Sequence, residues 1–275
     1  MALKGGTVMN GIDSALGCMK ESGIPISGAC RFDKGLILEG VRSVSRLPSS
    51  PTIILAGLFP YFAGQGGGNL SLYSAVADYH TVAGELLQSA CRRLKQLFPK
   101  NEFVPFVDAS PIDEVTAALR CGLGVRGKNG QLITKEYGSL VFIGEIVSDV
   151  ELEAEDSAES FCERCGACVA ACPTGALGTE GFSRELCRSH FSQKKGSLSE
   201  WEQSQIKDGG LAWGCDICTL ACPHNKSPAL TPVEGFLHSV QNSLTQENLP
   251  ELMKNRAFGW RGEAVLRRNL SLLRR

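Results

Sequence analysis

The segment with the clearest chemistry is "FCERCGACVAACPTGAL", residues 161–177, in which four cysteines fall within eleven positions. They are Cys162, Cys165, Cys168 and Cys172, and Pro173 follows the last of them. The pattern C-x2-C-x2-C-x3-C-P is the ligand run of bacterial ferredoxins, whose fourth cysteine binds the other cluster of a pair. A zinc site needs two C-x2-C pairs and has no use for a third and fourth cysteine at this spacing. The spacing therefore predicts iron–sulfur ligation.

A second cysteine run, "GCDICTLACPHNK", follows some forty residues later and ends in the same C-P step. Two four-iron clusters need eight thiolates, whereas the two runs together hold seven, and Cys187 in "SRELCRSHF" is the candidate for the eighth. The alternative is that Cys187 is a core thiol and that the second cluster has three irons or is absent. The predicted ligand sets are Cys162, Cys165, Cys168 and Cys222 for one cluster, and Cys172, Cys187, Cys215 and Cys218 for the other.

Composition agrees with metal binding rather than with disulfides. The chain has twelve cysteines among 275 residues. Its N-terminal segment shows no apolar signal region, twin arginine or cleavage site, and its longest apolar run, "TIILAGLFPYF", is too short to cross a bilayer. We therefore expect a cytoplasmic protein without membrane contact, in which thiols stay reduced. The scattered Cys18, Cys30, Cys91 and Cys121 are expected to be small buried hydrophobes.

The first half of the chain is predicted to be layered from helices and strands, as α/β or α+β. "PTIILAGLFPY" and "FVPFVD" favour buried strands, residues 70–98 a helix, and "QLIT" and "SLVFIGEIV" further strands. Ser110 followed by Pro111 predicts an N-cap for a helix that ends near Cys121. The acidic stretch at 149–160 predicts a boundary, because periodicity stops there and charge rises.

Three further motifs could carry chemistry. Asp108 ends an apolar strand, the usual place for ligand chemistry in layered folds, and an enclosed carboxyl there could act as an acid. A loop carboxylate bonded to nearby amides is the equal alternative. "GLGVRG" matches a nicotinamide fingerprint, but a helix precedes it and a strand follows, which is the wrong order. Its glycines therefore predict a tight turn or a close approach to a flat ligand.

The motif "ADYH" places Asp78 and His80 near the spacing of a cobalamin-ligating histidine. That motif is D-x-H-x-x-G, whereas Gly84 comes one residue too late here. We therefore expect no histidine ligand from the protein. Asp78 and His80 remain candidate pocket residues, with mutual bonding in a core as the alternative.

Taken together and in order, these motifs resemble the epoxyqueuosine reductase family. The resemblance runs from about residue 35 to residue 272 and rests on "DYH", "VDASP", "GLGVRGKN", "GSLVFIGEI", the eight cysteines and "WRGEAVLRRNL". It implies an α+β, layered cobalamin-binding domain, related to that of reductive dehalogenases, followed by a ferredoxin-like domain with two [4Fe-4S] clusters and C-terminal helices. The ranges that follow are 1–155 for cobalamin and substrate, 156–232 for the clusters, and 233–275 for the helices.

The resemblance also implies roles for individual residues. Electrons pass through the clusters to cobalt, an epoxide on a modified tRNA base is reduced, and Asp108 is the proton donor. Cys187 matches a family ligand. The implied partners are tRNA and a cytosolic electron donor such as flavodoxin or ferredoxin. The residues carried over as cobalamin contacts are Asp78, Tyr79, His80, Gly122, Gly124, Gly127 and Lys128.

The chain also departs from the family pattern. Val76 and Ala77 replace the glycine and arginine before "DYH", Val125 replaces a tryptophan, and His224 replaces another. "RSHFSQKKG" stands where the family has "ISYLTIE", and a helical-repeat extension found in some members is missing. The alternatives are a paralogue with another substrate, a non-catalytic iron–sulfur electron carrier, or a dehalogenase-like enzyme. The lack of an export signal is expected to disfavour the last.

Overall fold

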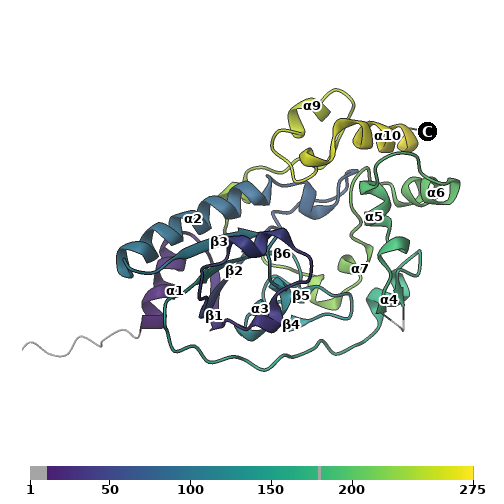
Figure 1. Cartoon of the computed structure of the whole chain (residues 1–275). Helices are drawn as coiled ribbons and strands as arrows, with labels where there is room; N and C mark the ends of the chain where they lie inside the picture. The colour runs from purple at the N-terminus through teal and green to yellow at the C-terminus, as the bar shows by residue number, and fades with distance from the viewer. Residues whose placement is uncertain (1–10, 179–180, 275) are drawn as a thin grey trace, which may run out of the picture. The chain divides into compact units, whose positions relative to one another are not determined.

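The computed structural model describes residues 11–178 and 181–274, which form two compact units. The described part of the first unit comprises residues 11–59, 83–123 and 143–159, and the second comprises 60–82, 124–142 and the chain from 160 onward (Figure 1). Both units draw on the first half of the chain, so they differ from the contiguous ranges expected from the sequence. The first ten residues of the N-terminal segment, and Arg275, lie outside the described residues.

The first unit is built on a four-stranded sheet with strand order β1-β2-β6-β3 (Figure 1). β1 is antiparallel to β2, and β3 is antiparallel to β6. This sheet and its helices confirm the predicted α+β layering. The elements in chain order are α1 (Gly11–Glu21), β1 (Ile26–Arg31), β2 (Ile53–Pro60), α2 (Tyr79–Leu97), β3 (Phe103–Val107), α3 (Glu114–Arg120) and β6 (Val141–Ser148).

Helices pack on both faces of this sheet, because strand side chains alternate between faces. One face carries a core that joins Ile54, Phe106 and Val147 to Ala117 of α3. Gly57 of β2 faces the other side of the sheet. A Cβ on this glycine would meet Met19 of α1. Gly144 of β6 likewise faces Leu87 of α2. Odd-numbered residues of β6 such as Glu145 therefore point toward α3.

The second unit consists mainly of short helices and two small hairpins. Its largest core surrounds Trp213 and Phe258, whose rings lie 5.8 Å apart. Ser199 and Glu202 form the capping box that starts α6. The elements are β4 (Val125–Arg126), β5 (Leu132–Ile133), α4 (Ala167–Ala171), β7 (Leu177–Gly178), β8 (Gly181–Phe182), α5 (Arg188–Gln193), α6 (Glu200–Gly209), α7 (Ile217–Leu220), α8 (Glu234–Leu237), α9 (Leu249–Leu252) and α10 (Glu263–Leu273).

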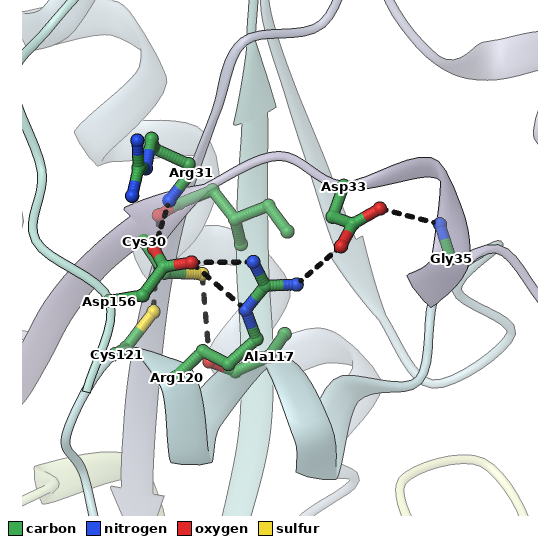
Figure 2. A network of polar contacts seen from close by, with 9 residues as sticks. Cys30, Arg31, Asp33, Gly35, Ala117, Arg120, Cys121 and Asp156 are labelled. Atoms are coloured by element: carbon green, nitrogen blue, oxygen red, sulfur yellow. Dashed lines mark hydrogen bonds and ion pairs between the residues drawn. The ribbon is translucent and has the colours of Figure 1, made fainter. Parts of the chain in front are cut away.

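The acidic stretch 149–160 has no helix or strand, and a polar network ties it to β1 and α3 (Figure 2). Asp156 accepts hydrogen bonds from the backbone N–H of Arg31 at 2.9 Å and from Nε of Arg120 at 3.2 Å. Arg120 also donates to Asp33 at 3.1 Å. Burial works against ionisation of Asp156, but the Arg120 guanidinium outweighs it and lowers the pKa of that carboxyl. One acidic residue of this stretch is thus a structural anchor.

The predicted strands are confirmed, but the helix predicted over residues 70–98 begins later. Residues 72–74 form a 3-10 turn, and α2 starts at Tyr79. Within residues 11–178 and 181–274, no helix combines the length and the apolar character needed to span a membrane.

Candidate functional site

Four cysteines of the second unit line one hollow: Cys162, Cys165, Cys168 and Cys222. The loop before α4 reverses within three residues because Arg164 and Gly166 both adopt positive φ, at 55° and 79°. This turn brings the first three cysteines of the run together, and Cys222 joins them from the C-terminal end of the second run. The hollow is therefore lined by cysteines from both runs.

A second hollow is lined by Cys172, Cys187, Cys215 and Cys218. Cys187 immediately precedes α5, and Cys215 and Cys218 flank the start of α7. The structure thus brings the eight cysteines together in the two groups that the spacing predicted. Among the described residues, no three His, Cys, Asp or Glu side chains are placed to hold a single metal ion.

Burial favours the protonated thiol at one cysteine of the first group and at two of the second, namely Cys222, Cys215 and Cys218. Burial, followed by the nearby Cys215, raises the pKa of Cys218 to about 11. Burial, followed by Cys168, Cys165 and Cys162, raises the pKa of Cys222 as well. Because metal ligands are thiolates, loading either group must release protons. Iron would supply the positive charge that stabilises the thiolate form of these cysteines. The two sets of four cysteines therefore fit iron–sulfur clusters.

Cys172 differs from these thiols. Burial raises its pKa, but the backbone N–H of Leu177 and the Thr174 hydroxyl outweigh burial and lower it. The Sγ of Cys172 lies 3.7 Å from Oγ1 of Thr174. Hydrogen bonds to a ligating sulfur tune the potential of an iron–sulfur cluster. The second group therefore carries a polar shell on at least one sulfur.

The glycine motif forms the β4–β5 hairpin. A Cβ on Gly124 would lie 2.6 Å from the carbonyl oxygen of Ile133, and one on Gly127 would lie 2.5 Å from Oδ1 of Asn129. The chain's own packing thus accounts for both glycines. Gly122 has φ of 73°, as a tight turn requires. Lys128 lies beside the first cysteine group, whose hollow it helps to line.

Asp78 and His80 bond to each other. Nδ1 of His80 lies 2.7 Å from Oδ1 of Asp78, and the two side chains are 36% and 27% exposed. Tyr79 stacks on both His80 and Phe142, with ring centroids 4.1 and 4.3 Å apart. Part of the motif therefore presents an ordered, partly exposed aromatic stack.

Asp108 directly follows β3 and lies on a strained turn of the first unit. Asp108 and Ala109 have φ of 51° and 34°, values that side-chain-bearing residues rarely adopt. The turn borders a cavity of about 350 Å³ whose wall includes Asp108, Ser110 and Glu114. The structure thus places the predicted acid at the wall of an open cavity.

The prediction that Ser110 caps the next helix is wrong. α3 begins at Glu114, and Asp113 is its N-cap, with Oδ1 accepting from the N–H of Thr116 at 3.1 Å. The hydroxyl of Ser110 instead donates to Glu145, a fully buried carboxyl in β6. Burial, followed by Glu114, raises the pKa of Glu145 to about 8.

Sequence reasoning missed Glu145 and Glu114. The available signal was a lone carboxylate inside the apolar strand "VFIGEIV". Burial, followed by Asp108 and Asp113, raises the pKa of Glu114 to about 7. Four carboxyls of the first unit are therefore linked electrostatically: Asp108 and Asp113 act on Glu114, and Glu114 acts on Glu145.

The arginines near the C-terminus could bind phosphates. Most of those that the structure describes, however, are bonded to other groups of the protein. Arg256 is 6% exposed and donates to the carbonyl of Ser239 at 2.7 Å. Arg268 donates to the carbonyls of Lys194 and Gly196. Arg267 pairs with Glu263. These arginines brace the helices, and they do not form a free cationic platform.

Comparison with known proteins agrees with the cysteine pattern. Residues 161–225 match the family model described as "4Fe-4S double cluster binding domain". The chain is 32% identical over 252 residues to the epoxyqueuosine reductase of Gloeobacter violaceus, covering 89% of this chain and 77% of that protein. It is 31% identical to the enzyme of Lactococcus garvieae, of which it spans 60%.

Solved structures show the same fold. An epoxyqueuosine reductase from Streptococcus thermophilus superposes with a TM-score of 0.77 at 26% identity, covering 94% of this chain and 79% of that one. A second epoxyqueuosine reductase, solved with an epoxyqueuosine-modified tRNA stem loop, gives a TM-score of 0.78 at 23% identity, with coverage of 94% and 79%.

Proposed function

Since the chain belongs to the epoxyqueuosine reductase family, we propose that it reduces the epoxide of epoxyqueuosine in tRNA to the alkene of queuosine. The reaction consumes two electrons and two protons and releases the epoxide oxygen as water. The observation that carries the proposal is the division of eight cysteines into two groups of four, each around its own hollow. Such a pair of sites is built to deliver single electrons to a two-electron reduction.

The eight cysteines are the proposed cluster ligands. Cys162, Cys165, Cys168 and Cys222 would hold one [4Fe-4S] cluster, and Cys172, Cys187, Cys215 and Cys218 the other. Cys165 is exposed, whereas Cys222 is buried. The first cluster would therefore have one corner that an external electron donor can approach. A cytosolic flavodoxin or ferredoxin is the proposed donor.

Cobalamin is the proposed second cofactor, and when bound it supplies low-valent cobalt as the two-electron reductant. The proposed contacts are the seven residues predicted from the resemblance. His80 is bonded to Asp78 through Nδ1, and the expectation of binding without a histidine ligand rests on the spacing, in which Gly84 comes one residue too late for the ligand motif. Tyr79 is stacked between His80 and Phe142, and this partly exposed aromatic stack supplies an apolar surface beside which a macrocycle could pack.

Asp108 is the proposed proton donor to the departing oxygen. Its carboxyl lies at the cavity wall, where Asp108 raises the pKa of the neighbouring Glu114. When Asp108 is protonated, it can transfer its proton as the C–O bond breaks, and solvent in the open cavity can restore it.

The tRNA substrate and a cytoplasmic setting are the finer parts of the proposal. The stem-loop complex of the related reductase supports tRNA. Because most C-terminal arginines are bonded internally, phosphate contacts would come from elsewhere, and the affinity should still fall with salt.

The proposal is tested in cells that lack their own epoxyqueuosine reductase, by analysis of their tRNA nucleosides. Wild type should restore queuosine. The Asp108→Asn protein should retain its iron but leave the epoxyqueuosine of the tRNA unreduced. Asp208→Asn, which changes an exposed aspartate of α6, serves as the matched control. Unchanged epoxyqueuosine with wild type at full cluster and cobalamin content would refute the proposed substrate.

A further inference from the structure

Glu145 is the most deeply buried carboxyl of the first unit that the proposed reaction does not use. It lies opposite Phe106 in the β3–β6 ladder, is 0% exposed and points toward α3. Its Oε1 accepts the hydroxyl proton of Ser110, while its Oε2 has no hydrogen-bond partner among the described residues. An ionised carboxylate with one unpaired oxygen is expensive to bury, so the neutral acid is the favoured form here.

Ser110 is held from two sides. Its hydroxyl donates to Glu145 in the sheet and accepts the backbone N–H of Ile112 at 3.2 Å. The serine is also only two residues beyond Asp108. This short connection joins the strained turn to the central sheet of the unit through β6.

The turn needs such a connection. Positive φ at Asp108 and Ala109 is strained, and strained backbone persists only where its surroundings hold it. Pro111 follows Ser110 and lacks an N–H that could help. The hydrogen bond from Ser110 is a side-chain tie between this turn and the sheet.

Glu114 adds an electrostatic reason for Glu145 to stay neutral. Its Oε2 is also buried without a partner among the described residues. Glu114 acts on Glu145, and Asp108 and Asp113 act on Glu114. These groups all carry the same sign of charge, so each ionisation makes the next less favourable.

We propose that Glu145 is a positioning residue for Asp108: in its neutral form it ties Ser110 to the sheet and so keeps the Asp108 carboxyl at the cavity wall. The catalytic meaning of this tie rests on the proposed function, but the tie itself does not. Ionisation of Glu145 would place an unpaired charge in the core, and release of the turn would admit the water that this charge needs.

The tie is tested first without substrate, by amide hydrogen exchange in the cluster-loaded protein. The reporter is the N–H of Asp113, which donates to the carbonyl of Leu36 at 2.8 Å and bonds to neither member of the tie. Ser110→Ala and Glu145→Leu should each speed its exchange about tenfold, the effect of one buried hydrogen bond. Glu145→Gln should not, because its carbonyl oxygen still accepts from Ser110. The control is Glu102→Gln, an exposed carboxyl just before β3.

The second arm measures turnover of epoxyqueuosine tRNA. Ser110→Ala and Glu145→Leu should each lower kcat about tenfold, and the double variant should be no worse than either. Wild type should lose rate above pH 8, where Glu145 ionises, whereas Glu145→Gln should keep kcat at pH 7 and should not show this fall. Losses that add in the double variant, or unchanged exchange at Asp113 in both single variants, would overturn the tie. If wild type turns over no epoxyqueuosine, the proposed function fails, and the exchange arm still decides the tie.

Discussion

The buried Glu145 makes the stability of this protein depend on pH in a way that one substitution should remove. We expect Glu145→Gln to equal wild type in stability at pH 5 and to exceed it progressively as the pH rises toward 8. The reason is that burial raises the pKa of Glu145 to about 8 from the ordinary value of 4.5, with Glu114 adding to the effect. Glutamine has the same shape but never ionises.

The sign follows from proton binding. Between the two pKa values the folded protein keeps the Glu145 proton, whereas the unfolded chain has lost it, so raising the pH favours unfolding. The stabilisation is complete below the unfolded pKa of 4.5 and is lost as the pH passes the folded value of about 8. Each pH unit in this window changes the free energy of unfolding by about 1.4 kcal/mol. Across the whole window one group therefore contributes about 5 kcal/mol.

The assay is chemical denaturation of the cluster-loaded protein at pH 5, 6, 7 and 8, followed by fluorescence or circular dichroism. Other groups also titrate in this range, since burial raises the pKa of Asp216 to about 6. The informative quantity is therefore the difference in unfolding free energy between variant and wild type. Glu102→Gln, which changes an exposed carboxyl, should give a difference that does not vary with pH.

Two results would refute the reasoning. A difference that stays constant from pH 5 to pH 8 would mean that Glu145 is ionised throughout the folded state. If wild type instead became more stable than Glu145→Gln as the pH rises, an unseen cation would have to stabilise the ionised form of Glu145. Either result would also remove the neutral carboxyl from the proposed tie to Ser110.

Three further predictions concern the second unit. Cys187→Ala should lower the iron content from about eight to about four per chain, and iron analysis that still finds about eight would remove Cys187 from the ligand set. His80→Ala should leave the paramagnetic resonance spectrum of bound cob(II)alamin unchanged and free of lower-ligand nitrogen splitting, and splitting that is lost in the variant would contradict this. Gly124→Ala should destabilise the protein by about 1–3 kcal/mol, because its Cβ would lie 2.6 Å from the Ile133 carbonyl; an unchanged melting temperature would show that the hairpin can relax.

The grouping of the cysteines could be predicted from sequence because it depends on local spacing and on a count. In known double-cluster proteins, the last cysteine of each run binds the cluster of the other run. Because two such clusters require eight ligands, one place remains, and Cys187 is the candidate for it. The main strands could be predicted for a similar reason. Eight consecutive buried residues, as in Ile53–Pro60, have few alternatives to a central strand.

The start of α3 could not be settled in this way. Ser110, Pro111, Asp113 and Glu114 contain two overlapping start signals, and the sequence favours the first. The tertiary structure selects Asp113, because the hydroxyl of Ser110 bonds to Glu145, thirty-five residues away. Helix propensity cannot reveal that Ser110 has another hydrogen-bond acceptor, because only the pairing of the strands brings Glu145 near it.

The roles of Glu145 and of the C-terminal arginines were decided in the same way. In sequence, Glu145 interrupts an apolar strand, and the arginines form a basic patch. In the structure, the register of β6 against β3 turns Glu145 into the core, and backbone carbonyls of α5 and the loop that follows it take up Arg261 and Arg268. Local spacing indicated which residues are the candidate metal ligands. Long-range pairing decided which polar groups are buried, because burial depends on what the rest of the chain places against each side chain.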